Sequence, residues 1–256
     1  MRALILAAGR GSRMRSLTAN APKCLVEIAG RSLLDWQLSA LRAGGIDQVA
    51  VVRGYQAEAL SGPGYQTFDN PRWAETNMVA TLTCADAWLR AGDCIVSYSD
   101  IAYHPSIVRT LASAPGDIVI SYDRWWKQLW TERFENPLGD AETFQCGADG
   151  RLAEIGGRSD SVHRIHGQYM GLLKFTTSGW QRLAAFLASL APEERDRLDV
   201  TGLFRRLVAE GWVISTVPIE GKWCEVDSDE DLRFYEQRLE QSVPWRHDWR
   251  WQEMAA

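Results

Sequence analysis

The sequence predicts the α/β fold class, with a mostly parallel mixed sheet that carries helices on both faces. Short apolar runs rich in Val and Ile alternate with longer segments whose apolar residues recur at helical spacing. Because parallel strands are joined by crossover connections, this alternation is typical of a parallel sheet between helices. With 256 residues, of which 46% are hydrophobic and 24% charged, the chain can bury a large core.

The first half of the chain supplies the most regular part of this pattern. Residues 2–7 form an apolar run typical of a buried strand, and the helix expected over 33–43 ends at Gly44-Gly45. The further elements expected here are a strand over 48–52, a helix over 78–90, a strand over 94–98, a helix over 105–112 and a strand over 117–122.

The pattern changes between about residues 125 and 164. Segments there are short and polar, and turn residues recur at Asn136-Pro137, Asp149-Gly150 and Gly156-Gly157. We therefore expect a β-rich insertion that carries a hairpin. The regular pattern then returns with a strand over 167–175, helices over 178–190 and 201–210, strands over 212–217 and 223–226, and a final helix capped by Ser228 and Asp231.

We expect one domain over residues 1–256, because the chain has no linker, internal repeat or low-complexity tract. Residues 1–122 and 176–256 form the core in this interpretation, and residues 123–175 form the β-rich insertion. The net charge of −5 argues against a nucleic-acid surface. No apolar run approaches the ~18 residues that a membrane span needs.

The five cysteines are scattered and form no Cys-x-x-Cys pair, which argues against a zinc site or a disulfide framework. The first strand begins almost at the first residue, so we expect no cleaved leader. Both observations favour a cytoplasmic protein. Trp245, Trp249 and Trp251 near the C-terminus are expected to pack a dimer contact or the sheet edge, which leaves a homodimer open.

The first expected strand leads into a glycine-rich stretch, in which residues 6–14 read Leu-Ala-Ala-Gly-Arg-Gly-Ser-Arg-Met, and Pro22-Lys23 follows. Glycine lets such a loop approach a ligand closely, and concave rows of backbone N–H groups bind phosphate. The stretch lacks the third glycine of a dinucleotide fingerprint and the Gly-Lys of a Walker loop. The alternative is that Gly9 and Gly11 only form a tight turn.

Two aspartates stand at the ends of expected strands. Asp100 closes the run that starts at Ile95, and Asp227 follows the strand over 223–226. In an open α/β sheet the carboxyl ends of the strands face the ligand crevice. Oxygen ligands from two carboxylates suit Mg²⁺. The alternative is a capping or turn role, above all for Asp227 beside Ser228.

The glycine-rich stretch together with Pro22-Lys23 resembles the signature of the sugar-phosphate and choline-phosphate nucleotidyltransferases. The resemblance implies a Rossmann-like fold and the transfer of a nucleotidyl group to a phosphorylated acceptor, with release of pyrophosphate. It implies that Asp100 and Asp227 hold Mg²⁺ and are catalytic together with Lys23 and Arg13. It further implies nucleotide binding by Leu6, Ala7, Ala8, Gly9, Gly11, Ser12, Arg13 and Lys23.

The resemblance also divides the work between the parts of the chain. Residues 1–122 would bind the nucleotide, residues 123–175 the acceptor, and residues 176–256 would complete the core with the second metal carboxylate. Lys23 would lie near the α-phosphate and the acceptor, and Arg13 near the leaving pyrophosphate. For Lys23 the alternative is an ordinary solvated surface charge.

Asn77, Met78 and Thr81 stand where cytidylyltransferases of this family carry an Asn-x-x-x-Ser/Thr-Leu segment beside the base. The uridylyl- and thymidylyltransferases tend to carry Gln-x-x-Pro-x-Gly-x-Ala there, which this chain lacks. The resemblance therefore favours CTP. The alternative for Asn77 is a helix N-cap.

The acceptor residues expected in the insertion are more loosely defined. Arg158 resembles a basic family position that grips the acceptor phosphate, although a lysine is usual there, and Tyr169 and Gly171 match a Gly-x-Tyr-x-Gly segment. Trp126 and Trp130, with Asp140 and Glu142 nearby, could form an aromatic cage for an ammonium group. The alternative is that the two tryptophans pack a core or a dimer face.

The sequence thus predicts a Mg²⁺-dependent cytidylyltransferase acting on CTP and a small acceptor such as phosphocholine or a phosphonate. One alternative is a sugar-1-phosphate nucleotidyltransferase that uses UTP, dTTP or CTP. The other is a nucleotide-binding regulatory subunit without turnover, although Lys23, Asp100 and Asp227 are all present. No nucleic-acid or membrane partner is expected.

Overall fold

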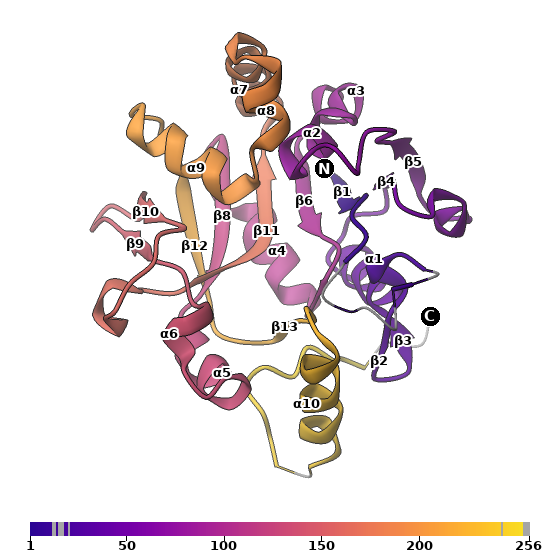
Figure 1. Cartoon of the computed structure of the whole chain (residues 1–256), viewed down its shortest axis with the longest axis vertical. Coiled ribbons are helices and arrows are strands. Elements are labelled where there is room, and N and C mark those ends of the chain that lie inside the picture. Colours follow the sequence, from indigo (N-terminus) through magenta and orange to yellow (C-terminus); the bar gives the residue numbers. More distant parts are fainter. Residues whose placement is uncertain (12–13, 15–17, 20, 242, 253–256) are drawn as a thin grey trace.

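A seven-stranded sheet forms the centre of the computed structural model, which describes residues 1–11, 14, 18–19, 21–241 and 243–252 (Figure 1). The strand order is β12-β8-β11-β6-β1-β4-β5. These strands are β1 (Arg2–Ala7), β4 (Val49–Arg53), β5 (Gln66–Asp69), β6 (Cys94–Tyr98), β8 (Ile118–Asp123), β11 (Gln168–Phe175) and β12 (Ser215–Ile219). Only β11 among them runs antiparallel to its neighbours, so the predicted mostly parallel mixed sheet is confirmed.

Side chains alternate across this sheet and feed two hydrophobic clusters, one on each face. Along β1, Ala3, Ile5 and Ala7 enter one cluster, and Leu4 and Leu6 enter the other. The first face is covered by α1 (Leu33–Ala43) and α4 (Pro105–Ser113). The second is covered by α2 (Met78–Thr83), α3 (Asp86–Arg90), α7 (Thr177–Ser189) and α9 (Val200–Ala209), with α8 (Pro192–Arg197) beside α2. Helices on both faces are therefore confirmed.

The prediction of one continuous helix over 78–90 is wrong, because the structure has two short helices there, α2 and α3. The break falls at Cys84 and Ala85. The Thr83 hydroxyl and the Cys84 thiol both donate to the carbonyl oxygen of Ala80. Such side-chain bonds compete with the helical ladder, and here they accompany its end.

The insertion carries the expected hairpin, β9 (Phe144–Cys146) and β10 (Leu152–Ile155), in antiparallel pairing. It also contains two helices, α5 (Trp126–Arg133) and α6 (Pro137–Asp140), which the β-rich description did not include. In Figure 1 these elements lie together on the side of the sheet opposite β4 and β5. The short 3₁₀ segments are η1 (Lys23–Leu25), η2 (Ala57–Leu60) and η3 (Val162–Arg164).

A second, two-stranded sheet lies outside the main one and fixes the two predicted aspartates. The strands β7 (Ile101–Tyr103) and β13 (Trp223–Glu225) pair antiparallel, and the N–H of Val226 donates to the carbonyl oxygen of Asp100 at 2.9 Å. β13 leads into α10 (Asp229–Glu240), which begins with the predicted capping box of Ser228 and Asp231. The two remaining strands, β2 (Glu27–Ile28) and β3 (Arg31–Ser32), form a small hairpin before α1.

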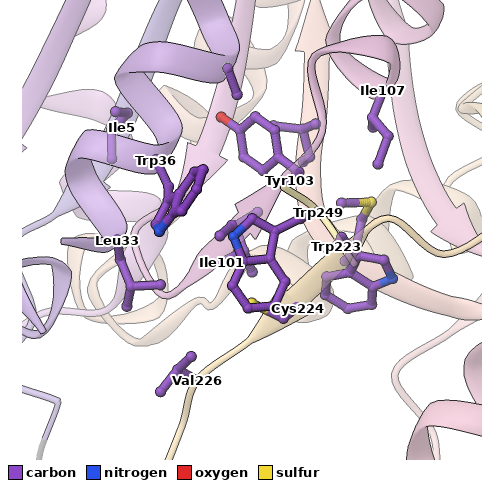
Figure 2. Packing of buried hydrophobic residues seen from close by; sticks show 14 of the residues in the cluster. Ile5, Leu33, Trp36, Ile101, Tyr103, Ile107, Trp223, Cys224, Val226 and Trp249 are labelled. Atoms are coloured by element: carbon purple, nitrogen blue, oxygen red, sulfur yellow. The ribbon is translucent and has the colours of Figure 1, made fainter. Parts of the chain in front are cut away.

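The C-terminal segment packs back onto the first face of the core. Figure 2 shows Trp249 among Trp36, Tyr103 and Trp223. The ring of Trp249 meets the ring of Trp36 edge-on at 6.2 Å and is 0% exposed. Trp249 therefore packs within this chain, and the expectation of a dimer contact does not fit it. In the part of the chain that the structure describes, no helix combines the length and hydropathy needed to cross a membrane.

Candidate functional site

Lys23, Asp100 and Asp227 come together although they are far apart in the sequence. The Nζ atom of Lys23 donates to Oδ2 of Asp100 at 2.8 Å and to Oδ1 of Asp227 at 2.5 Å. Lys23 begins η1, Asp100 follows β6, and Asp227 follows β13. The pairing of β7 with β13 brings the two aspartates side by side, so the predicted convergence of strand ends is present.

The ammonium group of Lys23 is held in its charged form. Burial alone would lower the pKa of Lys23. The charges and hydrogen bonds of Asp100 and Asp227 outweigh burial and raise this pKa above its usual value. Lys23 is only 8% exposed, so it is not the solvated surface charge of the alternative interpretation.

Glu225 is a third carboxylate at this point, and it is not among the residues predicted from the sequence. One oxygen each of Asp100, Glu225 and Asp227 lie within 4.8 Å of one another. Burial and the charges of Asp227 and Asp100 raise the pKa of Glu225 to about 8. The i, i+2 spacing of Glu225 and Asp227 puts both on one side of an extended segment, a signal available in the sequence.

This carboxylate cluster, Asp100, Glu225 and Asp227, has the donor set of a site for a hard divalent cation. All its donors are oxygen atoms, as Mg²⁺ prefers. The Oδ1 atom of Asp100 is buried and has no hydrogen-bond partner among the described residues. A buried polar atom without a partner is costly, and a bound cation would satisfy it. The residues present therefore fit a divalent cation.

The glycine-rich loop lies beside the carboxylate cluster. Gly11 has φ +69°, and a Cβ atom there would lie 2.8 Å from Cβ of Lys23, so only glycine lets the loop pack against this lysine. A cavity of about 250 Å³ opens at this place. Its lining consists of Leu6, Gly9, Gly11, Lys23, Met78, Tyr98, Ser99, Asp100 and Asp227. We call it the loop cavity.

Not every predicted nucleotide residue lines the loop cavity. Ala7 and Ala8 are buried at 2% exposure, while Ser12 and Arg13 lie outside the described residues. Asn77 caps α2, because its Oδ1 accepts the N–H of Met78 at 2.8 Å. The Thr81 hydroxyl is buried and accepts from Nδ2 of Asn70. Of the predicted base-binding group, Met78 alone borders the loop cavity.

A second cavity, of about 340 Å³, lies between the insertion and the carboxylate cluster. Five predicted acceptor residues line it, namely Trp130, Asp140, Glu142, Arg158 and Tyr169. The other lining residues are Tyr98, Thr143, Phe144, Ile155, Gln168, Thr201, Glu225 and Asp227. We call it the insertion cavity. It shares Tyr98 and Asp227 with the loop cavity, so the two cavities meet at the carboxylate cluster.

Hydrogen bonds hold the polar side chains of the insertion cavity in place. The indole N–H of Trp130 donates to Oδ2 of Asp140 at 2.9 Å, and the Arg158 guanidinium donates to the Asp140 carbonyl oxygen at 3.0 Å. The amide of Gln168 bonds both the N–H and the carbonyl oxygen of Glu142. Burial raises the pKa of the Glu142 carboxyl.

Trp126 and Gly171 do not line the insertion cavity. Trp126 packs in the core, since it is 3% exposed and its indole N–H donates to the carbonyl oxygen of Ile165 at 3.2 Å. Gly171 has φ +75°, and a Cβ atom there would lie 2.6 Å from the ring of Tyr98. Gly171 thus gives room to a tyrosine that lines both cavities.

A family model described as a MobA-like NTP transferase domain matches residues 3–170. The CTP:phosphoglutamine cytidylyltransferase of Campylobacter jejuni is 35% identical over 248 residues, which cover 91% of this chain and 98% of that relative. The 2-aminoethylphosphonate cytidylyltransferase of Lancefieldella rimae is 26% identical over 243 residues, which cover 91% of each chain.

Among solved structures, the CTP:phosphocholine cytidylyltransferase of Streptococcus pneumoniae has a similar fold. The TM-score is 0.72 at 21% identity, and the match covers 93% of this chain and 99% of that one. The inositol-1-phosphate CTP transferase of T. maritima gives the same TM-score at 17% identity. These likenesses confirm the predicted Rossmann-like fold.

Proposed function

Since this chain belongs to the family with the MobA-like NTP transferase domain, we propose that it is a cytidylyltransferase that joins CMP from CTP to a small phosphorylated or phosphonate acceptor. Pyrophosphate is the second product. Two relatives that match along nearly their whole length support this reaction, since their names give CTP:phosphoglutamine and 2-aminoethylphosphonate as substrates.

One observation carries the proposal: Lys23, Asp100 and Asp227 lie together where two separate cavities meet. Transfer between two substrates needs two binding spaces that share the reacting point. The loop cavity has a glycine-rich wall suited to a triphosphate, and the insertion cavity has the polar groups of a small-molecule pocket.

In the proposed reaction, an oxygen of the acceptor phosphate or phosphonate attacks the α-phosphorus of CTP. A bond forms between this oxygen and phosphorus, the bond from phosphorus to the bridging oxygen breaks, and the electron pair leaves with pyrophosphate. Charge grows on the phosphoryl oxygens during this step, so positioning and cations supply most of the catalysis. The Lys23 ammonium stabilises that charge, and Arg13 is proposed to face the leaving pyrophosphate.

Asp100, Glu225 and Asp227 would hold Mg²⁺. The bound ion would neutralise phosphate charge and polarise the phosphoryl oxygens. Ser12 of the loop, with Gly9 and Gly11, is proposed to contact the triphosphate.

The insertion cavity favours an acceptor whose far end carries a positive charge. Asp140 and Glu142 line it together with the aromatic rings of Trp130 and Tyr169. Carboxylates and aromatic faces both attract ammonium groups. Arg158 lies at the same cavity and supplies one positive charge for an anionic group of the acceptor.

The proposal is tested by measuring pyrophosphate release from CTP and Mg²⁺ with single acceptors. Phosphoglutamine, 2-aminoethylphosphonate, phosphocholine and glucose 1-phosphate are compared, each with CTP, UTP and dTTP. We expect release with CTP and at least one of the first three acceptors. Release only with the sugar phosphate would make the chain a sugar nucleotidyltransferase, and nucleotide binding without any release would make it a regulatory subunit.

A further inference from the structure

Arg133, the last residue of α5, is a buried cation that none of the steps above uses. Its side chain is 1% exposed. The guanidinium lies among three aromatic rings, 4.8 Å from the ring centre of Phe134, 5.1 Å from that of Trp130 and 5.8 Å from that of Tyr235. Burial of a charge is costly unless specific partners compensate it, so the contacts of this residue are informative.

Those contacts lead to the carboxylate cluster by two routes. The Nε and Nη2 atoms of Arg133 lie 3.0 and 2.9 Å from Oδ1 of Asp231. Its Nη1 atom has no hydrogen-bond partner among the described residues, and it lies 3.7 Å from Oε2 of Glu225. The unsatisfied donor of Arg133 therefore faces a member of the cluster.

Asp231 continues the first route to the neighbouring carboxylate. Its second oxygen, Oδ2, accepts the N–H groups of Asp227 and Ser228, each at 3.0 Å, and the Ser228 hydroxyl at 3.1 Å. One oxygen of Asp231 thus accepts hydrogen bonds from the turn that carries Asp227, and the other oxygen binds the Arg133 guanidinium. One carboxylate therefore links the Arg133 guanidinium to the backbone of Asp227.

The same helix also borders the proposed acceptor site. Trp130 lies one helical turn before Arg133 and lines the insertion cavity, and the guanidinium contacts its ring. The helix α5 therefore has one side chain at the acceptor cavity and another behind the carboxylates.

We propose that Arg133 is a positioning residue that sets Asp227 through Asp231, sets Glu225 directly, and so fixes the carboxylate cluster for its cation. The expected loss of turnover rests on the proposed function, whereas the expected loss of cation binding does not. Groups that orient metal-binding side chains typically affect metal affinity by about 10- to 100-fold.

The test variant is Arg133→Lys, which keeps the charge but loses the forked geometry. Arg238→Lys is its matched control. Arg238 also joins α10 to α5, with Nε 3.5 Å from Oε2 of Glu132, and it lies over the ring of Trp245, but it contacts no member of the cluster. Mn²⁺ binding is measured on each protein without nucleotide, followed by kcat and KM for CTP and acceptor and by the unfolding midpoint.

We expect Arg133→Lys to bind Mn²⁺ about tenfold more weakly than the wild type and to lose kcat by a similar factor, with the KM for CTP within about threefold. Arg238→Lys should match the wild type in Mn²⁺ binding even if it unfolds more easily. Wild-type Mn²⁺ affinity in a folded Arg133→Lys protein would overturn the inference.

A second variant covers the case in which Arg133→Lys does not fold. Asp231→Asn keeps the side-chain shape and removes the charge that Arg133 binds, so it should weaken Mn²⁺ binding in the same direction. Unchanged Mn²⁺ binding in this variant would also overturn the inference. Failure of the wild type to release pyrophosphate would refute the proposed function alone, because the Mn²⁺ measurement needs no substrate.

Discussion

Lys23 neutralises two carboxylates that would otherwise repel each other at close range. Its Nζ atom lies 2.8 and 2.5 Å from the oxygens of Asp100 and Asp227. The convergence of Asp100 and Asp227 could be predicted from the sequence because two strand ends mark the ligand edge of an α/β sheet, and the family resemblance added Lys23. The sequence prediction did not include Glu225, because Asp227 alone already provided a carboxylate at the end of that strand.

We expect Lys23→Met to lower kcat by about 10²- to 10³-fold, the usual effect of removing one charge-stabilising donor. The two carboxylates left behind should also lower the free energy of unfolding at pH 7 by about 1–3 kcal/mol. Pyrophosphate assays and urea unfolding measure the two effects, with the exposed Lys127→Met as control. A variant with wild-type turnover would remove Lys23 from the reaction.

The pH range over which Lys23 stabilises the fold follows from its raised pKa. Because the pKa of Lys23 is raised, its ammonium group loses its proton and its stabilising charge only in the alkaline range, above the usual pKa of lysine. Lys23→Met should therefore show an unfolding deficit that stays constant between pH 7 and pH 9. A deficit that disappears by pH 9 would contradict this cause.

Gly171→Ala tests the contact between β11 and Tyr98. The substitution places a Cβ atom 2.6 Å from the tyrosine ring at φ +75°. Gly150→Ala is the matched control, because Gly150 has φ +74° and a Cβ atom added there would meet no other atom within 4 Å. We expect the control to lose about 1 kcal/mol of unfolding free energy and Gly171→Ala about 3 kcal/mol. Equal losses of unfolding free energy in the two variants would show that the Tyr98 ring can move aside without cost.

At the scale of elements, α5 shows what the sequence could not settle. Its two tryptophans lie one helical turn apart, and either could have lined a ligand site. The structure separates them, since Trp130 lines the insertion cavity while Trp126 packs in the core. Only the packing of α5 against β13 and α10 decides which ring faces the cavity, and spacing along one helix does not contain that information.

We expect Trp130→Phe to raise the acceptor KM about tenfold and to leave the KM for CTP unchanged, because the variant loses the indole N–H that holds Asp140. Trp126→Phe on the same helix should lower stability and leave both KM values unchanged. Steady-state kinetics with each substrate varied in turn checks this. The reverse pattern would place Trp126 at the acceptor.

A buried carboxylate joins the C-terminal segment to the sheet. Asp123 is 0% exposed and accepts hydrogen bonds from Nε2 of His247 at 2.8 Å, from Nε1 of Trp223 at 3.0 Å, and from the N–H groups of Trp125 and Gly221. Burial by itself would raise the pKa of Asp123, but the His247, Trp223 and Trp125 bonds outweigh it and lower the pKa.

A lowered pKa in the folded state stabilises the chain above the usual pKa of aspartate, and this stabilisation is lost as the pH falls through the folded value. We therefore expect Asp123→Asn to cost about 3–5 kcal/mol at pH 7 and clearly less below about pH 4. Urea unfolding at both pH values checks this, with the exposed Asp160→Asn as control. A deficit independent of pH would contradict the role of the charge.

At the scale of the whole molecule, the sheet and its two helical layers were predictable because periodicity and turn residues record them directly. The insertion was less predictable, since α5 is mostly polar and its buried face consists only of Trp126, Leu129 and Trp130. The insertion cavity could not be predicted, because its lining comes from β6, the first part of the insertion, β11, α9 and the end of β13 with the residues after it. No local pattern records how five such segments meet.

The two cavities meet at the carboxylate cluster, and under the proposed function nucleotide and acceptor would bind on opposite sides of it. Asp227 lines both of them, so its removal should affect transfer itself more than the binding of either substrate. Asp227→Asn preserves the shape of the side chain and the turn held by Asp231, which makes it the cleanest variant for this question.

The most direct measurement is ³¹P NMR of the products formed from CTP, Mg²⁺ and phosphoglutamine or 2-aminoethylphosphonate by the wild type and by Asp227→Asn. A CMP-linked acceptor and an equal amount of pyrophosphate should appear with the wild type, at least about 10²-fold faster than with the folded variant. Formation of the linked product at the same rate by both proteins would mean that the carboxylate cluster is not the site of transfer.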